Sequence, residues 1–365
     1  MGLTTRHTSH VLYEGLTAQE KARAAVINAF ASNPEDFNKR FLVRQVIGFG
    51  TNGAVLAAQD ISGTTGLPVV AIKIIYKRHA GRIEKTPPPE IDVLRHLSAT
   101  GGSPYIVHSI ADWQDLNHFY LVTELFGSSW IETVPEPTLR PLEFTMSYRN
   151  VNKSYSFPMF DGSSDLWAYA FVMRTHIRHI DGHMLLPLEP VKRIIKQVAM
   201  ALLFIHEAGY FHGDVKCENI LVAQTIDSIA NIRLADFGHS RPINNGIKSY
   251  GTRAVSPPEF YIDAPFESDE LDGRCSDIYG LGIVLYSLLN DKGLSTPPSP
   301  IPAGSTTIRY DELLVVDGGR YPLSGISELD QEGWNLLHSM CMVDPAQRIT
   351  IKQVLSHPWL QEVVL

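Results

Sequence analysis

The hydrophobic residues of this chain follow two different patterns. Between residues 41 and 125 they form short β-branched and aromatic runs, such as FLVRQVIG, LPVVAIKII and FYLVTEL, separated by Gly-rich turns. Such runs predict strands. From residue 165 onward they recur at helical spacing, which predicts helices over 166–178, 189–209, 277–290 and 331–342. The pattern therefore predicts an α+β chain in which a small, mostly β part precedes a larger helical part.

The segment before residue 39 has its own helix signal. Thr17 and Glu20 have the spacing of a capping box, in which the two side chains satisfy the first amides of a helix. The helix is expected to reach about Phe30, because Ser32-Asn33-Pro34 would end it. Residues 1–38 are therefore predicted to be a partly helical N-terminal extension.

A second segment, at about residues 131–164, combines prolines with Ser, Asn and Gly clusters and has no clean period. This composition predicts an insertion or long loop. Four aromatic residues in or beside this segment could dock a partner, but packing against the larger part is the preferred interpretation. These residues are Trp130, Tyr148, Tyr155 and Phe157. The predicted organisation is an extension over 1–38, the small part over 39–127 and the large part over 128–361, which contains the insertion.

Composition and charge restrict the function classes. The 365 residues are 44% apolar and 19% charged, as in a soluble globular protein. The net charge of −8 argues against nucleic acid as a partner, because phosphate-backbone binding needs a basic face. The three cysteines, Cys217, Cys275 and Cys341, suit neither a disulfide framework nor a zinc site. The longest apolar run, 278–289, is shorter than the ~20 residues of a membrane span and predicts a helix buried on all sides. We expect a monomer in the cytoplasm or nucleus, with no membrane partner.

The first chemical motif is the glycine-rich segment IGFGTNGAV, which spans residues 47–55. In a dinucleotide-binding fold a helix would follow such glycines, whereas here a second strand follows. Gly48, Gly50 and Gly53 are therefore expected to form a hairpin that covers phosphates. Taken alone, the motif is also compatible with a hairpin that binds no ligand.

The second motif places Lys73 inside an apolar strand, in VAIK. Strand alternation puts Ala71 and Lys73 on one face. A buried lysine is costly unless it meets an anion and a carboxylate, and Glu90 is the nearest candidate. Residues 87–89 are prolines, which are tolerated only in the first helical turn, so Glu90 should lie at the start of a helix over 90–97.

The third and fourth motifs bring together an acid, a base, an amide and a second acid. In FHGDVKCENIL, Asp214 can accept a hydroxyl proton, Lys216 can offset phosphoryl charge and Asn219 can ligate a metal. Asp236, after the strand NIRLA, can hold Mg²⁺ on ATP, because magnesium prefers oxygen ligands and phosphates. Each acid alone could cap a turn or face solvent, but all four motifs occur in order.

Together these motifs resemble the protein kinase superfamily, over about residues 41–360. The resemblance continues through Gly251-Thr252, Ser256 to Glu259, Asp277 and Arg348. It implies a two-lobed protein kinase fold, with a small mostly β N-lobe and a larger α-helical C-lobe. It also implies transfer of the γ-phosphate of ATP, with Mg²⁺ as cofactor, to a protein substrate. In this family Glu259 would pair with Arg348, and Asp277 would brace the catalytic loop.

The resemblance also assigns individual roles. Val55, Ala71 and Leu221 would sandwich adenine, Glu124 and Phe126 would bind it through backbone groups, and Thr123 would be the gatekeeper. The full cofactor-binding set is Ile47, Gly48, Gly50, Gly53, Val55, Ala71, Lys73, Glu124, Phe126 and Leu221, with Asn219 and Asp236 as metal ligands. Asp214, Lys216, Lys73, Glu90 and Thr252 are the catalytic set. Lys216 and Thr252 are similar to Ser/Thr rather than Tyr kinases, because the threonine hydroxyl can bridge Asp214 and Lys216.

Finer features are similar to the PIM and PAS-linked kinases of the calmodulin-kinase-like branch. These are GTRAVSPPE, the Glu before Asn in VKCENIL and a short helix after Pro89. Glu218 and the acids nearby suggest a substrate that is basic around the acceptor Ser or Thr. The acids between 263 and 272 could contribute, although such a run is usually a solvated loop.

One position departs from the family pattern, because Gly213 stands where the H-R-D triplet has Arg. In the family that Arg binds a phosphate on the activation segment, here residues 236–259. We therefore expect activity without activation-segment phosphorylation. The alternatives are an ATP-binding pseudokinase that acts as a scaffold and, further off, a small-molecule phosphotransferase.

Overall fold

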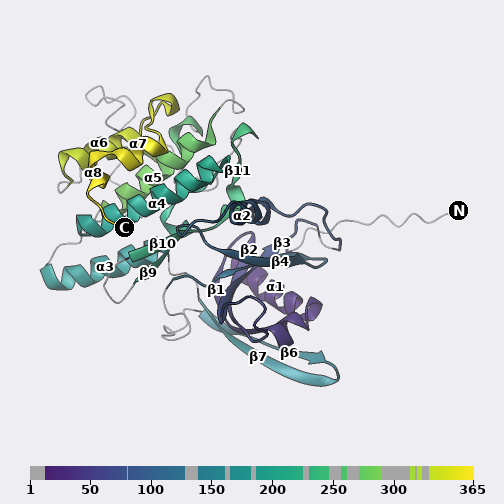
Figure 1. Cartoon of the computed structure of the whole chain (residues 1–365). Helices are drawn as coiled ribbons and strands as arrows, with labels where there is room; N and C mark the ends of the chain where they lie inside the picture. The colour runs from purple at the N-terminus through teal and green to yellow at the C-terminus, as the bar shows by residue number, and fades with distance from the viewer. Residues whose placement is uncertain are drawn as a thin grey trace. The chain divides into compact units, whose positions relative to one another are not determined.

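The computed structural model describes residues 13–79, 81–127, 139–160, 165–181, 186–224, 230–245, 256–260, 271–289, 313–316, 319–322 and 329–365. The chain forms two compact units (Figure 1). The N-terminal unit comprises Met1–Ile91, His108–Leu125 and Ser129–Ser163, and the C-terminal unit comprises Asp92–Val107, Phe126–Ser128 and Ser164–Leu365. The first contains one large sheet and the second is mostly helical, which confirms the predicted α+β class.

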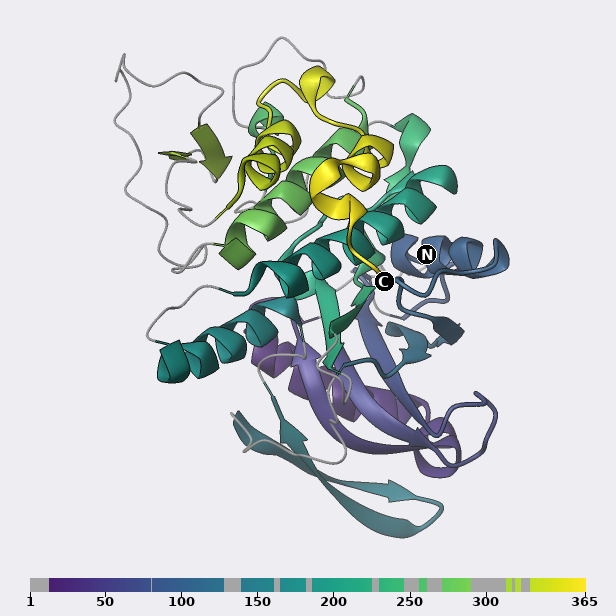
Figure 2. The same cartoon turned by 60° about the vertical axis from the view of Figure 1, so that its left-hand side comes forward.

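Seven strands form the sheet of the N-terminal unit, in the order β4-β5-β3-β2-β1-β7-β6 (Figures 1 and 2). Adjacent strands are antiparallel except β1 and β7, which meet in parallel at Val46 and Met159. The strands are β1 (Phe41–Phe49), β2 (Gly53–Asp60), β3 (Val69–Tyr76), β4 (Ser109–Gln114), β5 (His118–Glu124), β6 (Leu139–Tyr148) and β7 (Val151–Met159). The register places Val55, Lys73 and Leu121 beside one another across β2, β3 and β5.

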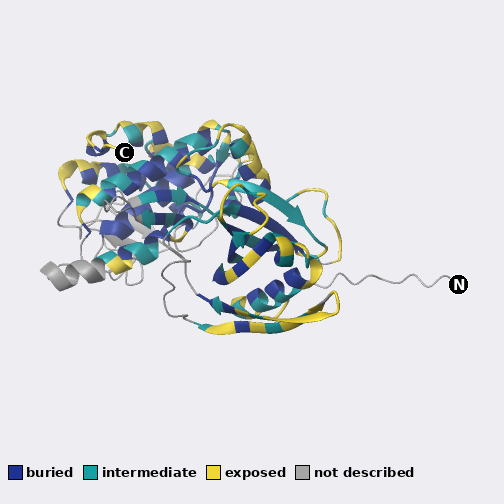
Figure 3. Cartoon of the chain, turned by 60° about the horizontal axis from the view of Figure 1, so that its bottom comes forward, coloured by how far each residue is buried: buried dark blue, intermediate teal, exposed yellow. Residues whose placement is uncertain are grey.

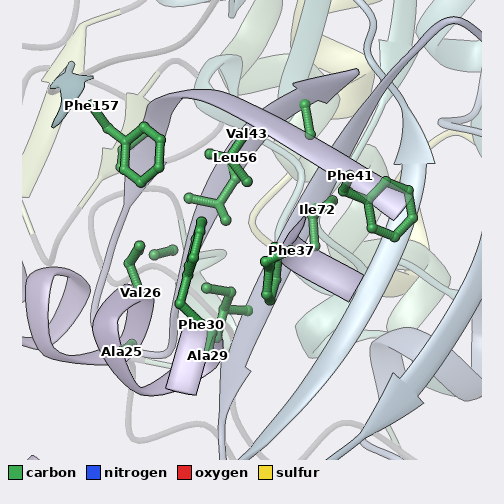
Figure 4. Close-up of a cluster of buried hydrophobic side chains, with 14 of the residues drawn as sticks. Ala25, Val26, Ala29, Phe30, Phe37, Phe41, Val43, Leu56, Ile72 and Phe157 are labelled. Atoms are coloured by element: carbon green, nitrogen blue, oxygen red, sulfur yellow. The ribbon is translucent and has the colours of Figure 1, made fainter. Parts of the chain in front are cut away.

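The predicted N-terminal helix is present as α1 (Ala18–Ser32), with both halves of the Thr17–Glu20 capping box. Its buried residues recur at helical spacing: Ala22, Ala25, Val26, Ala29 and Phe30. They pack against sheet residues that include Val43, Leu56 and Ile72 in one hydrophobic cluster (Figure 4). Figure 3 shows the buried and exposed faces of this amphipathic helix. The segment is therefore part of the core of the N-terminal unit.

Residues 139–159 differ from the prediction, because they form the β6–β7 hairpin of the N-terminal sheet and not a long loop. The hairpin turns through Arg149 and Asn150, whose φ values of 51° and 63° are those of a two-residue hairpin turn. Pro141 and Pro158 fall where the register of the two strands is irregular, so they do not prevent pairing. For Tyr155 and Phe157 the expected packing on the larger part is wrong, because their rings pack against Phe30 within the N-terminal unit.

An aromatic cluster joins the helix to the hairpin. The Phe30 ring stacks on Phe37, with 4.7 Å between centroids, and it meets Phe144, Tyr155 and Phe157 at 5.4, 4.8 and 5.5 Å. These distances are those at which aromatic pairs stabilise a core beyond the area that they bury. Helix α1 thus packs against side chains of β6 and β7, two strands that lie far from it in the sequence.

The C-terminal unit is built mostly of helices, and α2 (Pro89–Ala99) links it to the N-terminal unit in the sequence. The helices that follow are α3 (Leu166–Asp181), α4 (Leu188–Glu207), α5 (Gly273–Leu289), α6 (Gln331–Met340), α7 (Ile351–Ser356) and α8 (Pro358–Gln361). Short strand pairs accompany them: β8 (Tyr210–Phe211) with β11 (Arg241–Pro242), β9 (Ile220–Gln224) with β10 (Ala230–Leu234), and β12 (Leu313–Val316) with β13 (Gly319–Pro322). As predicted, residues 278–289 of α5 are buried on all sides. Within the described ranges, no helix has the length and apolarity needed to span a membrane.

The packing of Phe30 predicts a large loss of stability when its ring is removed. Phe30 is 2% exposed, so Phe30→Ala should lower the free energy of unfolding by about 3–5 kcal/mol. Leu16→Ala is the control, because Leu16 lies in the same segment, is 39% exposed and should change stability by no more than about 0.5 kcal/mol. Urea denaturation measures both. Equal, small losses would mean that the helix contributes little to the core.

Candidate active site

Strand β3 carries Lys73 on the face of the sheet opposite to α1. Ile72 and Ile74 are fully buried in the cluster that contains α1, so alternation places Ala71 and Lys73 on the other face. The Lys73 Nζ lies 2.7 Å from Oε1 of Glu90, whose side chain is almost entirely buried. Glu90 lies in the first turn of α2, directly after the three prolines. The expected ion pair is therefore present, although the glutamate lies at the very start of its helix.

The glycine-rich segment forms the predicted strand–turn–strand between β1 and β2. The amide of Gly50 donates to the carbonyl of Gly53 at 2.9 Å and closes the turn. A Cβ at Gly53 would lie 2.6 Å from the carbonyl oxygen of Ile74, so only glycine allows β2 to approach β3 here. At Gly48 and Gly50 the space that a Cβ would occupy is open. The turn therefore has open space beside Gly48 and Gly50.

A small apolar cluster contains two of the predicted cofactor-binding residues. Ile47 and Val55 pack with Ala57, Leu125 and Phe160. Phe160 follows the hairpin strand β7, its amide donates to the carbonyl of Val46 at 3.1 Å, and its side chain is buried. The sequence analysis did not single out Phe160, since its position depends on how β7 pairs with β1. Its alternation with Met159, which faces the α1 cluster, is the signal that was available.

The backbone groups of Glu124, which follows the gatekeeper position, already form hydrogen bonds within the protein. The Glu124 amide donates to the carbonyl of His108 at 3.0 Å, and the Glu124 carbonyl accepts from the Thr123 hydroxyl at 3.1 Å. A carbonyl has a second lone pair, so the Glu124 oxygen can still accept from adenine. The guanidinium of Arg233 lies over the Phe126 ring, with its Cζ 4.3 Å from the centroid of the ring.

The catalytic loop of the C-terminal unit is held by the fully buried Asp277 of α5. Its carboxylate accepts from the amides of His212 and Gly213 at 2.7 and 2.8 Å, and it lies 2.9 Å from Nε2 of His206 on α4. Charge-assisted bonds of this kind are stronger than neutral ones. The bracing of this loop by Asp277, which the resemblance implied, is present.

Three of the predicted residues meet at Asp214, which is 3% exposed. The Asp214 Oδ2 is 2.9 Å from the Lys216 Nζ and accepts from Nδ2 of Asn219 at 3.0 Å. The same Nδ2 donates to the Asp214 carbonyl at 2.8 Å, which makes the amide oxygen of Asn219 the atom that would ligate a metal. Among the described residues, the buried Oδ1 of Asp214 has no hydrogen-bond partner.

Asp236 lies next to this loop through a backbone contact. The amide of Ala235 donates to the carbonyl of Asn219 at 2.8 Å, so the two predicted metal ligands belong to adjoining segments. Asp236 has φ 60° and ψ 72°, a left-handed conformation that costs about 1–3 kcal/mol and is typical of functional turns. Carboxylate and amide oxygens are the donors that Mg²⁺ takes together with phosphates, so these residues fit that ion. The remaining adenine candidate in this unit, Leu221, lies on β9 opposite Arg233.

Gly213 has a structural reason to be glycine. Its φ is +79°, and a Cβ there would lie 2.7 Å from the carbonyl oxygen of His239, two residues after Phe237. The Ser240 hydroxyl also donates to the carbonyl of His212 at 3.0 Å, which fixes the two segments together. An Arg at position 213 is therefore incompatible with this backbone unless the segment after Asp236 moves.

The pair of Glu259 and Arg348 is also formed. The Arg348 Nη1 donates to Glu259 at 2.7 Å, its second terminal nitrogen contacts the other carboxylate oxygen, and both side chains are almost fully buried. Its Nε also donates to the carbonyl of Met342 at 2.7 Å, so this charge is paired and hydrogen-bonded, as a buried ion must be. Thr252 lies outside the described residues, as do Gly251 and Trp130.

Comparison with known proteins agrees with this geometry. The family model described as "Protein kinase domain" matches residues 145–360, more than half of the chain. The chain therefore belongs to the protein kinase domain family, and it is a protein serine/threonine kinase by its relatives. Protein kinases of this family use ATP and Mg²⁺.

Three relatives illustrate the match. The chain is 26% identical to the calcium/calmodulin-dependent protein kinase cmkA of Emericella nidulans, over 93% of this chain and 67% of the relative. It is 26% identical to the calcium/calmodulin-dependent protein kinase type 1 of Macrobrachium nipponense, over 88% and 75%. It is 28% identical to the maternal embryonic leucine zipper kinase of Xenopus laevis, over 47% of this chain but only 24% of that protein. These relatives include calmodulin-dependent kinases, while the finer resemblance to PIM and PAS-linked kinases stays a prediction.

The surroundings of Gly213 predict that even a methyl group is harmful there. Gly213→Ala should lower the free energy of unfolding by more than the about 1–2 kcal/mol that left-handed backbone costs a non-glycine residue. The matched control is Gly209→Ala, since Gly209 has a similar φ of +87° but nothing within 4 Å of the added Cβ. Urea denaturation of both variants separates the contact from the backbone cost. Equal losses would show that the His239 segment yields to the methyl group.

Proposed function

We propose that this chain is an active enzyme that transfers the γ-phosphoryl group of ATP to a Ser or Thr hydroxyl of a protein. The observation that carries the proposal is the environment of Asp214. One of its oxygens contacts Lys216 and Asn219, while the other is buried with no partner in the described part of the chain. An unsatisfied buried oxygen is costly, and a substrate hydroxyl would satisfy it.

The proposed mechanism assigns the proton and the charge to named atoms. The Asp214 Oδ1 accepts the hydroxyl proton as the hydroxyl oxygen bonds to the γ-phosphorus and the bond from that phosphorus to the bridging oxygen of ADP breaks. The Lys216 ammonium, 2.9 Å from the other Asp214 oxygen, offsets the negative charge of the phosphoryl group that is transferred. Lys73, oriented by Glu90, would hold ATP phosphates, and Asn219 and Asp236 would hold Mg²⁺, which when bound neutralises phosphate charge.

A scaffold without catalysis is the second candidate, because Gly213 departs from the family pattern. Binding of ATP alone does not distinguish the two, whereas phosphoryl transfer by purified protein does. The contacts of Asp214, Lys216 and Asn219 favour the enzyme, since a protein that only binds nucleotide has no need of a positioned base.

A basic segment around the acceptor is the proposed substrate preference. Glu218 is exposed beside the buried catalytic residues, so its carboxylate is accessible to a peptide. Asp272, which belongs to the acidic run, is engaged by Arg274 at 2.6 Å, and the acids at 263, 267, 269 and 270 lie outside the described residues. Glu218 is therefore the feature that supports this preference.

Regulation is proposed to be independent of activation-segment phosphate. The family's phosphate-binding Arg is absent at Gly213, and the neighbouring carbonyl leaves no room for it. Arg241 and Arg253 are the candidate substitute anchors. Arg253 lies outside the described residues, and the Arg241 Nη1 already donates to the carbonyls of Gly238 and Ser240 at 3.2 and 2.6 Å. With glycine at position 213, that position supplies no guanidinium that needs a phosphate before the loop can order.

Asp214→Asn should reduce phosphoryl transfer by about 10²- to 10⁴-fold, the usual contribution of a positioned general base. Nucleotide affinity should stay near that of the wild type, because Asp214 faces the acceptor and not the nucleotide. Lys73→Met is the contrast, since it should weaken ATP binding as well. Transfer to a randomised peptide library and titration with labelled ATP measure the two quantities. Undiminished transfer by Asp214→Asn would reject the proposed base.

Protein made in bacteria and treated with phosphatase should give a linear time course of peptide phosphorylation from the first minute. A lag followed by a rise of about tenfold or more, roughly 1.4 kcal/mol in effective barrier, would instead reveal a phosphate switch. The double replacement of Ser249 and Tyr250 is the control. It should leave the linear course unchanged, and loss of a rise in that variant would locate the switch.

A further inference from the structure

Lys77, directly after β3, is a buried lysine to which the proposed mechanism gives no role. It is 3% exposed, and its Nζ donates to the side-chain oxygen of Gln114 at 2.6 Å and to the carbonyls of Asp115 and Arg82 at 2.6 and 2.9 Å. Burial lowers the pKa of Lys77, against the opposing effect of nearby carboxylates. A buried ammonium is costly unless hydrogen bonds satisfy it, and these three acceptors use all three of its protons.

The acceptors of Lys77 join two stretches of backbone in the N-terminal unit. One is the linker of residues 78–88, which leads from β3 to α2, and the other is the β4–β5 turn of residues 114–118. Gln114 also pairs with the backbone of Glu84, since it donates to that carbonyl at 2.8 Å and accepts from that amide at 2.9 Å. The amide of Gly81 donates to the carbonyl of Leu116 at 2.9 Å. The linker is thus hydrogen-bonded to the turn at Gly81 and Glu84, and through Lys77 at Arg82.

The N-terminal segment is also hydrogen-bonded to this turn. The Asp115 Oδ2 accepts from the side-chain amide of Asn33, just after α1, at 2.9 Å and from the Tyr120 hydroxyl at 2.5 Å. The Asp115 Oδ1 accepts from the amides of Asn117 and His118, both at 2.7 Å. These bonds outweigh the effect of burial and hold the pKa of the Asp115 carboxyl below its usual range. The turn is therefore a fixed support for the linker.

The linker ends where the proposed ATP-binding pair begins. Residues 87–89 are prolines, which restrict the backbone, and Glu90 follows them in the first turn of α2. An acid deep inside a helix is positioned by the whole helix, whereas an acid at its first turn depends on the segment that enters the helix. The location of the Glu90 carboxylate, 2.7 Å from Lys73, then depends on where the linker is held.

We propose that Lys77 is a positioning residue for Glu90. By binding the linker to the β4–β5 turn, its ammonium fixes the entry into α2, so that the glutamate reaches Lys73. The inference deepens the proposed function and rests on it for its kinetic readout. A lysine that merely fills a buried site would stabilise the fold, but its effect on turnover would not depend on Glu90.

A double-mutant cycle on kcat for peptide phosphorylation tests this dependence, with wild type, Lys77→Met, Glu90→Gln and the double variant. Lys77→Met should lower kcat about 10- to 100-fold, because a displacement of about 1 Å at a site can cost about 10²-fold. In the Glu90→Gln background the same substitution should change kcat by less than about twofold, the range expected of experimental additivity errors. The same factor in both backgrounds would overturn the proposal.

Lys85→Met is the matched control, since Lys85 is an exposed lysine of the same linker and should leave kcat unchanged. If Lys77→Met does not fold, Gln114→Leu replaces it in the cycle, because it removes both bonds to Glu84 and one of the three bonds of Lys77, while the Lys77 bonds to the carbonyls of Arg82 and Asp115 remain. Gln114→Leu should likewise lower kcat about 10- to 100-fold in the wild-type background. In the Glu90→Gln background it should change kcat by less than about twofold.

Amide hydrogen exchange supplies a readout that needs no catalysis. In the Lys77→Met or Gln114→Leu protein, exchange should accelerate at Gly81, Glu84 and Ile91 but not at Phe30 in α1. If the wild-type protein showed no turnover, that result would contradict only the proposed function. The exchange rates would then decide whether Lys77 holds the linker. Unchanged exchange at these three amides would overturn the positioning role.

Discussion

The two-residue alternation of strand β3 is the constraint on which the N-terminal unit depends. One face of the strand supplies Ile72 and Ile74 to the core with α1, and the other presents Lys73 to Glu90. A shift of register by one residue would place the ammonium in the hydrophobic core and the isoleucines at the proposed nucleotide face. The hydrophobic packing on one face of the sheet and the ion pair on the other therefore specify the same register of β3. Each of the two interactions stabilises the register that the other needs.

In the C-terminal unit a single carboxylate has a comparable effect. Asp277 lies on a helix that is buried on almost every side, so its position varies little, and it holds the amides of His212 and Gly213. Those amides precede Asp214, whose own oxygens are oriented by Lys216 and Asn219. The geometry of the candidate base is thus transmitted from the core through backbone hydrogen bonds, which allow less freedom than side-chain contacts alone.

Much of this arrangement could be predicted from sequence, because short-range patterns carry it. The Thr17–Glu20 cap, the strand containing Lys73 and the loop around Asp214 all depend on residues close in the chain. The hairpin of residues 139–159 could not be predicted from its composition, since its prolines suggested a loop and its pairing with β1 is a long-range contact. For the same reason the burial of Phe30 and the location of Phe160 were missed: both depend on side chains more than 100 residues away in the sequence.

The discontinuity of the N-terminal unit has a consequence for the order in which the protein can fold. Synthesis proceeds from the N-terminus, and strands β1 to β5 and helix α1 are complete by Glu124. At that point Phe30 of α1 still lacks its contacts with Phe144, Tyr155 and Phe157. The nascent chain therefore exposes an apolar surface and an unpaired β1 edge until Met159 has left the ribosome, the interval in which a holding chaperone or an incorrect strand partner would compete for it.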